Sequence, residues 1–264
     1  MNPILLDLGF IQIRWYSVLI LFAFIIGYFL VINRCKKKGI STTQISDMCF
    51  YLVIVSILGA RIYYCIFNFN QYKNIIDIFK IWEGGLAIHG GVIAGIIFIY
   101  FFTKKKKIPL LEVLDIFAPA LVLGQAIGRW GNFFNQEAFG PETTLTTLRS
   151  LNIPQFIIDG MYIDHAYHHP TFLYESLGCL IIFIIIMIVR NLKVIKQGQI
   201  SAIYFILYGL IRFFIESLRQ DSLMLFNIKV AQLVSVLMIL TGLFLFIKIP
   251  QKIKNNIYKI YFLL

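Results

Sequence analysis

The chain has 264 residues, of which 59% are hydrophobic and only 14% are charged, and its mean hydropathy is +0.80. A disordered chain needs low hydrophobicity, and a nucleic-acid-binding domain carries its basic residues on a soluble surface, so both classes are excluded. A soluble domain of this length would have about a quarter of its residues charged. The composition therefore indicates an integral membrane protein, in which a net charge of +11 needs an explanation.

Seven apolar windows predict an all-α integral membrane protein with seven transmembrane helices, since each crossing needs about 20 mostly apolar residues. They cover residues 14–33, 47–67, 85–103, 111–135, 172–190, 199–218 and 229–248. The fourth window is the weakest, because glycine and polar residues interrupt it between Gly124 and Asn132. The first window is expected to stay in the mature protein, because it lacks the features of a cleavable signal. We expect residues 1–264 to form a single polytopic membrane domain.

Most basic residues fall in alternate connections between these windows, as the positive-inside rule requires of cytoplasmic segments. The clusters are Arg34–Lys38, Lys104–Lys107, Arg190–Lys196 and Lys248–Lys259. This distribution predicts an N-terminus outside and a C-terminus in the cytoplasm. The one long connection, about residues 136–171, is then outside and is expected to form a small extracytoplasmic cap, because loops of that length are folded or functional. The charge excess is thus mainly a topology signal.

Three arginines, Arg61, Arg129 and Arg212, fall within predicted helices, where an ionisable group costs about 2.5–3.5 kcal/mol on insertion scales. At 1.5 Å per residue they lie about 21, 27 and 20 Å from the cytoplasmic starts of their helices. All three are therefore expected in the outer half of the bilayer. The helices that enter from outside bring further polar groups to the same level: Tyr16, His89, Tyr174 and Glu175.

The spacing of the polar groups predicts which of them share a face. Tyr208, Arg212 and Glu216 stand four residues apart and lie on one helix face, where Arg212 and Glu216 have a simple explanation as a self-neutralising pair. Arg129 has no acidic residue three or four positions away, so its partner must come from another helix or from an anionic ligand. Because Arg binds phosphate oxygens through two N–H groups at once, two arginines at headgroup level favour a phosphate-bearing ligand.

His89 lies at the level of these arginines and is a candidate general base, although a histidine in a membrane is also often a structural hydrogen-bonding residue. The adjacent Gly90 and Gly91 allow either close helix packing or access of a headgroup to the backbone. Tyr16 has a second explanation, because aromatic residues line membrane interfaces. The histidines of residues 165–169 lack further ligands at helical spacing, so no metal site is expected.

One block of residues, Gly128 to Glu137, reads GRWGNFFNQE and is highly specific. Further blocks follow in compatible order: Arg14-Trp15-Tyr16, Gly59-Ala60-Arg61, Trp82-Glu83-Gly84-Gly85, His89-Gly90-Gly91, His169 to Glu175, and Tyr208 to Glu216. Together they resemble the bacterial prolipoprotein diacylglyceryl transferase family over residues 14–216. After Glu216 the chain reads Arg219-Gln220-Asp221, which departs from the Arg-Glu-Pro-Asp-like run of that family and puts the role of this loop in doubt.

The resemblance implies an enzyme of the bacterial plasma membrane, with several crossings and an active site towards the outer leaflet. Such an enzyme transfers the diacylglyceryl group of phosphatidylglycerol to the lipobox cysteine thiol of a prolipoprotein, beside its signal peptide. It forms a thioether and releases glycerol 1-phosphate, as the first step of lipoprotein maturation. The implied partners are these two substrates and the membrane lipids, with no nucleic acid, no cofactor and no metal.

The expected roles combine the resemblance with this chemistry. Arg129 and Arg212 bind the phosphate and stabilise its negative charge, and His89 accepts the thiol proton, because the thiolate is the nucleophile. Tyr16 acts in catalysis by orienting the headgroup. The other expected phosphatidylglycerol-binding residues are Asn132, which orients the headgroup, Glu137 and Glu216, which hold the arginines, and Tyr208, Arg61, Gly90 and Gly91.

Two other classes of function compete with this interpretation. A lipid or anion transporter also places arginines and a histidine in a membrane cavity, but it is expected to carry polar groups through both leaflets or inverted repeats, and the sequence has neither. An intramembrane serine protease is less favoured, because no serine and histidine pair stands in a nucleophile-elbow context.

Overall fold

The computed structural model describes residues 1–9, 12–72, 74–81 and 84–261, and it describes side chains up to residue 248 except those of Gln71 and Ile75. Trp82 and Glu83 of the sequence blocks therefore lie outside the described residues. So do the side chains of the C-terminal lysines of the last basic cluster, from Lys252 onwards. The described chain forms two compact units, unit 1 (Met1–Leu30 and Leu114–Leu264) and unit 2 (Val31–Val113).

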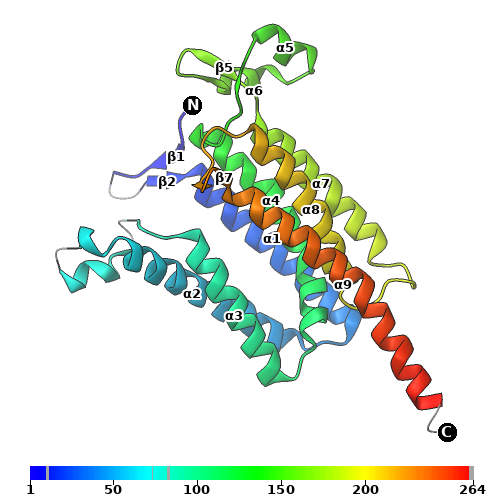
Figure 1. Ribbon diagram of the computed structural model, residues 1–264. Helices are drawn as coiled ribbons and strands as arrows, with labels where there is room; N and C mark the ends of the chain where they lie inside the picture. The colour runs from blue at the N-terminus through cyan, green and yellow to red at the C-terminus, as the bar shows by residue number, and fades with distance from the viewer. Residues whose placement is uncertain (10–11, 73, 82–83, 262–264) are drawn as a thin grey trace. The chain divides into compact units, whose positions relative to one another are not determined.

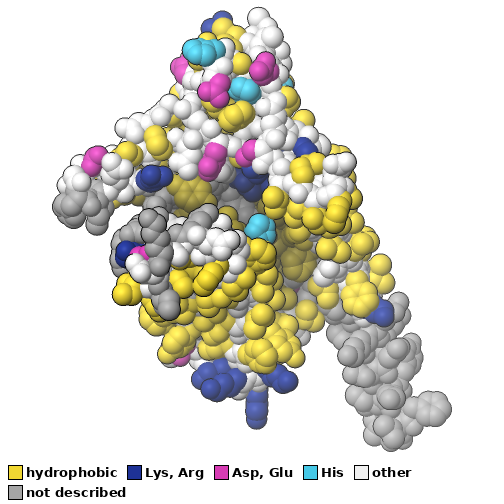
Figure 2. Space-filling model, turned by 60° about the vertical axis from the view of Figure 1, so that its left-hand side comes forward, with side chains coloured by type: hydrophobic (Ala, Val, Ile, Leu, Met, Phe, Trp, Pro, Cys, Tyr) yellow, Lys and Arg dark blue, Asp and Glu magenta, His cyan; other side chains and the backbone are white. Residues whose placement is uncertain are grey.

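Seven of the described helices are long and apolar enough to cross a membrane, as the sequence predicts. They are α1 (Trp15–Lys38), α2 (Thr42–Phe67), α3 (Ile88–Lys106), α4 (Leu110–Asn135), α7 (Thr171–Val189), α8 (Gln199–Leu218) and the Val230–Lys248 part of α9 (Val230–Tyr261). Hydrophobic side chains cover much of the helical surface in Figure 2, and dark blue Lys and Arg side chains gather at its lower edge. A mostly helical membrane protein is therefore confirmed.

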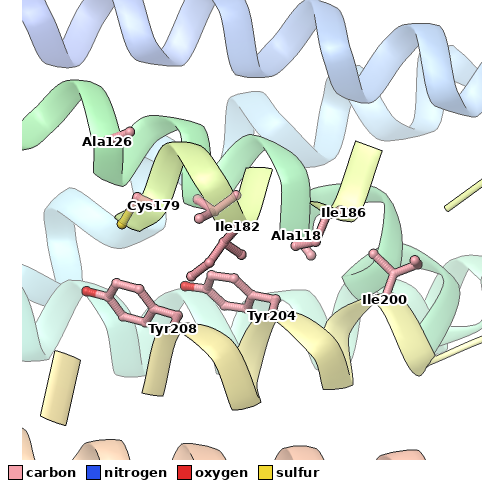
Figure 3. Packing of buried hydrophobic residues seen from close by; sticks show 9 residues of the cluster. Ala118, Ala126, Cys179, Ile182, Ile186, Ile200, Tyr204 and Tyr208 are labelled. Atoms are coloured by element: carbon pink, nitrogen blue, oxygen red, sulfur yellow. The ribbon is translucent and has the colours of Figure 1, made fainter. Parts of the chain in front are cut away.

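The core of unit 1 lies where α4, α7 and α8 meet (Figure 1). Small residues of α4, including Ala118 and Ala126, face Ile182 of α7 across this core. Tyr204 and Tyr208 extend side by side from α8, with stacked rings whose centroids are 5.7 Å apart (Figure 3). Buried side chains from all three helices thus meet in one cluster.

The connection from α4 to α7 is folded. It contains the short helices α5 (Leu145–Ser150) and α6 (Gln155–Gly160) and a three-stranded antiparallel sheet in the order β3 (Glu142–Thr143), β5 (Ala166–His168), β4 (Tyr162–Ile163). Leu148, Ile157 and Ile158 are fully buried and pack in one cluster with Phe133 at the end of α4 and Phe172 at the start of α7. This shared cluster fixes the segment to the ends of both helices.

Two hairpins stand at the same end of unit 1 as this segment (Figure 1). The first pairs β1 (Ile4–Asp7) with β2 (Gln12–Arg14), directly before α1. The second pairs β6 (Met224–Leu225) with β7 (Ile228–Lys229), between α8 and α9.

Unit 2 consists mainly of α2 packed against α3, with two 3₁₀ turns, Phe69–Gln71 and Ile75–Phe79, in the connection between them. The α2–α3 contact depends on glycine. A Cβ on Gly90 would lie 2.3 Å from Tyr63 Cβ and 2.4 Å from the Gly59 carbonyl oxygen, and one on Gly91 would lie 3.1 Å from the Ser56 carbonyl oxygen. Both glycines therefore serve helix packing, which is one of the two roles that the sequence allows them.

An aspartate from α4 caps the N-terminus of α8. The Asp115 carboxylate accepts hydrogen bonds from the backbone N–H of Gly198 (2.6 Å), the backbone N–H of Ser201 (2.8 Å) and the Ser201 hydroxyl (2.7 Å). The first N–H groups of a helix lack partners within the helix, and a negative charge there is favourable. Asp115 thus fixes the start of α8 to α4. It is far from α8 in the sequence, unlike the neighbouring residue that usually caps a helix.

We expect Asp115→Ala to lower the free energy of unfolding by about 1–2 kcal/mol, because it leaves buried N–H groups at the α8 N-terminus without an acceptor. In detergent this lowers the Tm by about 2–8 °C. Asp159→Ala is the matched control, because Asp159 is an exposed residue whose carboxylate accepts only from the Gln155 side chain in the structure described. An Asp115→Ala protein as stable as the control would contradict the capping role.

Candidate active site

Four charged side chains from α4, α7 and α8 form a continuous ion-pair network in unit 1. Arg129 Nη2 lies 2.7 Å from Glu175 Oε1, and Arg212 Nη1 lies 3.0 Å from Glu175 Oε2. Arg212 Nη2 lies 2.6 Å from Glu216 Oε2, one helical turn further along α8. A single carboxylate on α7 therefore holds an arginine from each neighbouring helix.

The network is buried on its acidic side and open on its basic side. The side chains of Glu175 and Glu216 are 2% and 3% exposed, whereas those of Arg129 and Arg212 are 20% and 15% exposed. Tyr208 adds a hydrogen bond from its hydroxyl to Glu175 Oε1 (3.2 Å). A molecule that reaches this site from outside thus meets the guanidinium groups, and the carboxylates stand behind them.

The pairing that the sequence predicts for these residues can now be compared with the structure. The Arg212–Glu216 pair at i and i+4 is confirmed. The partner of Arg129 comes from another helix, which is one of the two sources that the sequence leaves open. The sequence places Glu175 at the right level but assigns it no part in holding the arginines. The sequence feature that points to this role is the position of Glu175 near the outside end of its predicted helix, at the level of both arginines.

The Glu137 carboxylate is hydrogen-bonded to asparagine side chains in the structure described. Its Oε1 accepts hydrogen bonds from Asn132 Nδ2 (2.8 Å) and Asn135 Nδ2 (3.3 Å). Asn132 Oδ1 in turn accepts a hydrogen bond from Arg129 Nη1 (3.4 Å). Glu137 therefore reaches Arg129 through Asn132 and orients this amide, which is an indirect way of holding the arginine.

Tyr16 lies directly against α4 at this level. A Cβ added to Gly131 would lie 2.3 Å from Tyr16 Cδ2, a distance that carbon atoms do not adopt without displacement. The absence of a side chain at Gly131 thus lets the Tyr16 ring rest on the α4 backbone, two residues after Arg129. One glycine in the GRWGNFFNQE block therefore has a packing reason that involves another predicted site residue.

Arg61, in unit 2, binds backbone carbonyl groups. Its guanidinium donates to the carbonyl oxygens of five residues in the α2–α3 connection, at 2.7–3.4 Å: Asp77, Ile78, Lys80, Gly84 and Gly85. An Arg side chain has five N–H donors, so these hydrogen bonds match its capacity. Arg61 is 7% exposed. The geometry favours a structural role for Arg61, in which it organises the connection that leads into α3.

His89, the second residue of α3, is exposed in unit 2. Its ring centroid lies 6.3 Å from that of Tyr63 on α2. An exposed imidazole is free to exchange protons with a substrate or with water, which is the minimum requirement for a general base. The described side chains hold no group of three or more His, Cys, Asp or Glu that suits a metal ion.

Comparison with known proteins gives one consistent family. The family model described as prolipoprotein diacylglyceryl transferase matches residues 3–248. Relatives named phosphatidylglycerol–prolipoprotein diacylglyceryl transferase include one from Streptococcus suis, 48% identical over 92% of this chain and 90% of its own length. One from Pediococcus pentosaceus is 45% identical over 90% and 86%, and one from Thermotoga maritima is 45% identical over 94% and 85%. Since the match runs along nearly the whole chain, the chain belongs to the prolipoprotein diacylglyceryl transferase family.

Proposed function

We propose that this protein transfers the diacylglyceryl group of phosphatidylglycerol to the lipobox cysteine thiol of prolipoproteins, the first step of lipoprotein maturation. The observation that carries the proposal is the arginine pair of the network, which is partly exposed and backed by buried carboxylates. Two guanidinium groups held at a fixed separation suit a phosphodiester, because each presents paired N–H donors to phosphate oxygens. The names of the relatives support the same activity.

The proposed reaction is a displacement in which negative charge develops on the leaving phosphate. The thiolate sulfur attacks the glyceryl carbon that bears the phosphodiester oxygen, a thioether bond forms, and the carbon–oxygen bond breaks. Glycerol 1-phosphate leaves with the bonding electron pair, and Arg129 and Arg212 stabilise its negative charge. His89 accepts the thiol proton, because a free cysteine thiol with a pKa of about 8.5 supplies little thiolate at neutral pH. Asn132 and Tyr16 orient the headgroup.

The proposal includes the setting of the reaction. The enzyme lies in the bacterial plasma membrane with its N-terminus outside and its C-terminus in the cytoplasm, supported by the distribution of basic residues. The network then faces the outer leaflet, and the folded α4–α7 segment is an extracytoplasmic cap. Both units belong to one polytopic membrane domain. The protein substrate is recognised at its signal peptide and lipobox.

Replacement of either network arginine by lysine is expected to reduce the rate of diacylglyceryl transfer by about 10²–10³-fold, because an ammonium group lacks the planar pair of N–H donors. The measurement is the release of glycerol phosphate from phosphatidylglycerol in the presence of a lipobox peptide. Arg149→Lys, at an exposed position in α5, is the control and keeps its activity. Full activity of both Arg129→Lys and Arg212→Lys would remove the proposed phosphate site.

Glu175→Gln is expected to lower kcat about tenfold or more, because it removes the charge that fixes both guanidinium groups. The KM for phosphatidylglycerol does not rise, since the lost negative charge no longer competes with the phosphate for the arginines. Steady-state kinetics separate these two effects. The control is Glu142→Gln in the exposed part of β3. An unchanged kcat, or a loss expressed only in KM, contradicts the positioning role of Glu175.

His89→Gln is expected to lower kcat/KM by about 10²–10⁴-fold, because an amide side chain cannot accept the thiol proton. The measurement is again the release of glycerol phosphate in the presence of a lipobox peptide. His165→Gln, at an exposed turn between β4 and β5, serves as the control. If His89→Gln is as active as this control, another group accepts the proton.

A further inference from the structure

The hairpin β6–β7 presents an uncharged, strongly apolar tip outside the membrane-spanning helices. Leu223, Met224, Leu225 and Ile228 are 51–63% exposed, and Phe226 at the turn is 93% exposed. Single exposed apolar residues are normal on a protein surface, but a contiguous group outside a transmembrane segment indicates a surface that is covered by something else.

The backbone of the tip holds Phe226 at a conformational cost. Phe226 and Asn227 form the two-residue loop and both have positive φ values, 46° and 63°, as a type I′ turn requires. Asn tolerates this region, whereas a bulky side chain is an outlier there. Because Phe226 gains almost no burial within the protein, its side chain is not explained by packing.

The base of the hairpin is fixed to the C-terminal end of α8. Lys229 Nζ donates to the carbonyl oxygens of Glu216 (2.8 Å), Ser217 (3.2 Å) and Arg219 (2.7 Å), at the helix terminus where carbonyl groups run out of partners within the helix. Arg219 forms two hydrogen bonds with the Asp221 carboxylate, at 3.0 and 2.9 Å. The charged residues that flank the tip are thus paired at its base.

The Asp221 carboxylate stays ionised in this arrangement. Partial burial acts to raise the pKa of Asp221, but the hydrogen bonds and the positive charge of Arg219 outweigh it and hold the pKa below its usual value. The base thus keeps a net positive charge, from Lys229, beneath an apolar tip. A basic group next to exposed apolar side chains suits a membrane interface.

The length of α8 and the short connection to α9 place the hairpin relative to the membrane. Helix α8 has 20 residues and is about 30 Å long, the thickness of the hydrocarbon core, so it ends at the boundary with the headgroups. Phe226 at the tip lies four positions before Val230, the first residue of α9, which is at most about 13 Å of extended chain. The hairpin stands at this end of α8 (Figure 1), and it therefore lies within or beside the headgroup layer.

Both faces of the hairpin carry exposed apolar side chains, and the charged strand residue Lys229 has its ammonium group on carbonyl oxygens at the end of α8. Apolar side chains on two faces fit surrounding lipid better than a protein partner on one face. Successive strand residues point to opposite faces, and Met224 and Leu225 are both more than half exposed. A strand that binds a protein on one face keeps polar residues on the other. We propose that the β6–β7 hairpin inserts its Phe226 tip into the lipid leaflet on the network side of the membrane and anchors the end of α8 there. Only the identity of this leaflet as the outer one rests on the proposed function.

Site-directed spin labelling tests the insertion directly. Phe226→Cys carries a nitroxide label on the full-length protein in phosphatidylcholine vesicles, which contain no phosphatidylglycerol, so the result does not depend on the proposed activity. The four native cysteines are buried. The measurement compares collisions of the label with oxygen, which concentrates in lipid, and with a water-soluble nickel complex. Ser150→Cys at the exposed end of α5 provides the aqueous reference, and Ile181→Cys, 59% exposed in the middle of α7, provides the lipid reference.

We expect the oxygen-to-nickel collision ratio at position 226 to lie well above that of the Ser150 label and to approach that of the Ile181 label. A ratio equal to the Ser150 value overturns the proposal, because the tip is then in water. Shielding from both reagents overturns it as well, because protein then covers the tip. If Phe226→Cys does not fold, Leu225→Cys gives the same test from the adjacent position.

Discussion

The pairing of Glu175 with two arginines is the interaction on which the described site depends. A charged group in hydrocarbon is costly unless it is paired and hydrogen-bonded, and here one carboxylate pairs with Arg129 and Arg212 and accepts a hydrogen bond from Tyr208. The three groups belong to α4 and α8, so satisfying Glu175 fixes the height and rotation of both helices against α7. Burial of the carboxylates then leaves the arginines as the reactive surface.

The hydropathy of the sequence predicts the helices well, because lipid exposure demands long apolar segments regardless of how they pack. The predicted window at residues 199–218 coincides with α8, and that at 111–135 with α4 except for one residue. The first window stops near residue 33, whereas α1 continues to Lys38. Hydropathy measures the apolar length, but backbone hydrogen bonding continues the helix beyond it into the basic segment.

The candidate site is predictable only where the partners are close in sequence. Arg212 and Glu216 stand one turn apart, so their pairing follows from helix geometry. The pairing of Arg129 with Glu175 joins residues on separate helices, and no local pattern specifies which faces of these helices meet. The same limit applies to Arg61, whose N–H groups bind the backbone carbonyls of a connection without regular sequence periodicity.

The two ends of α8 explain why the network can keep its geometry. Asp115 places a negative charge at the N-terminus of α8, and Lys229 places a positive charge at its C-terminus, each opposite in sign to the helix dipole that it meets. One contact comes from α4 and the other from the hairpin that precedes α9, so α8 cannot slide along its axis without losing hydrogen bonds at one end. Arg212 and Glu216 are therefore held in depth by contacts that are not themselves part of the site.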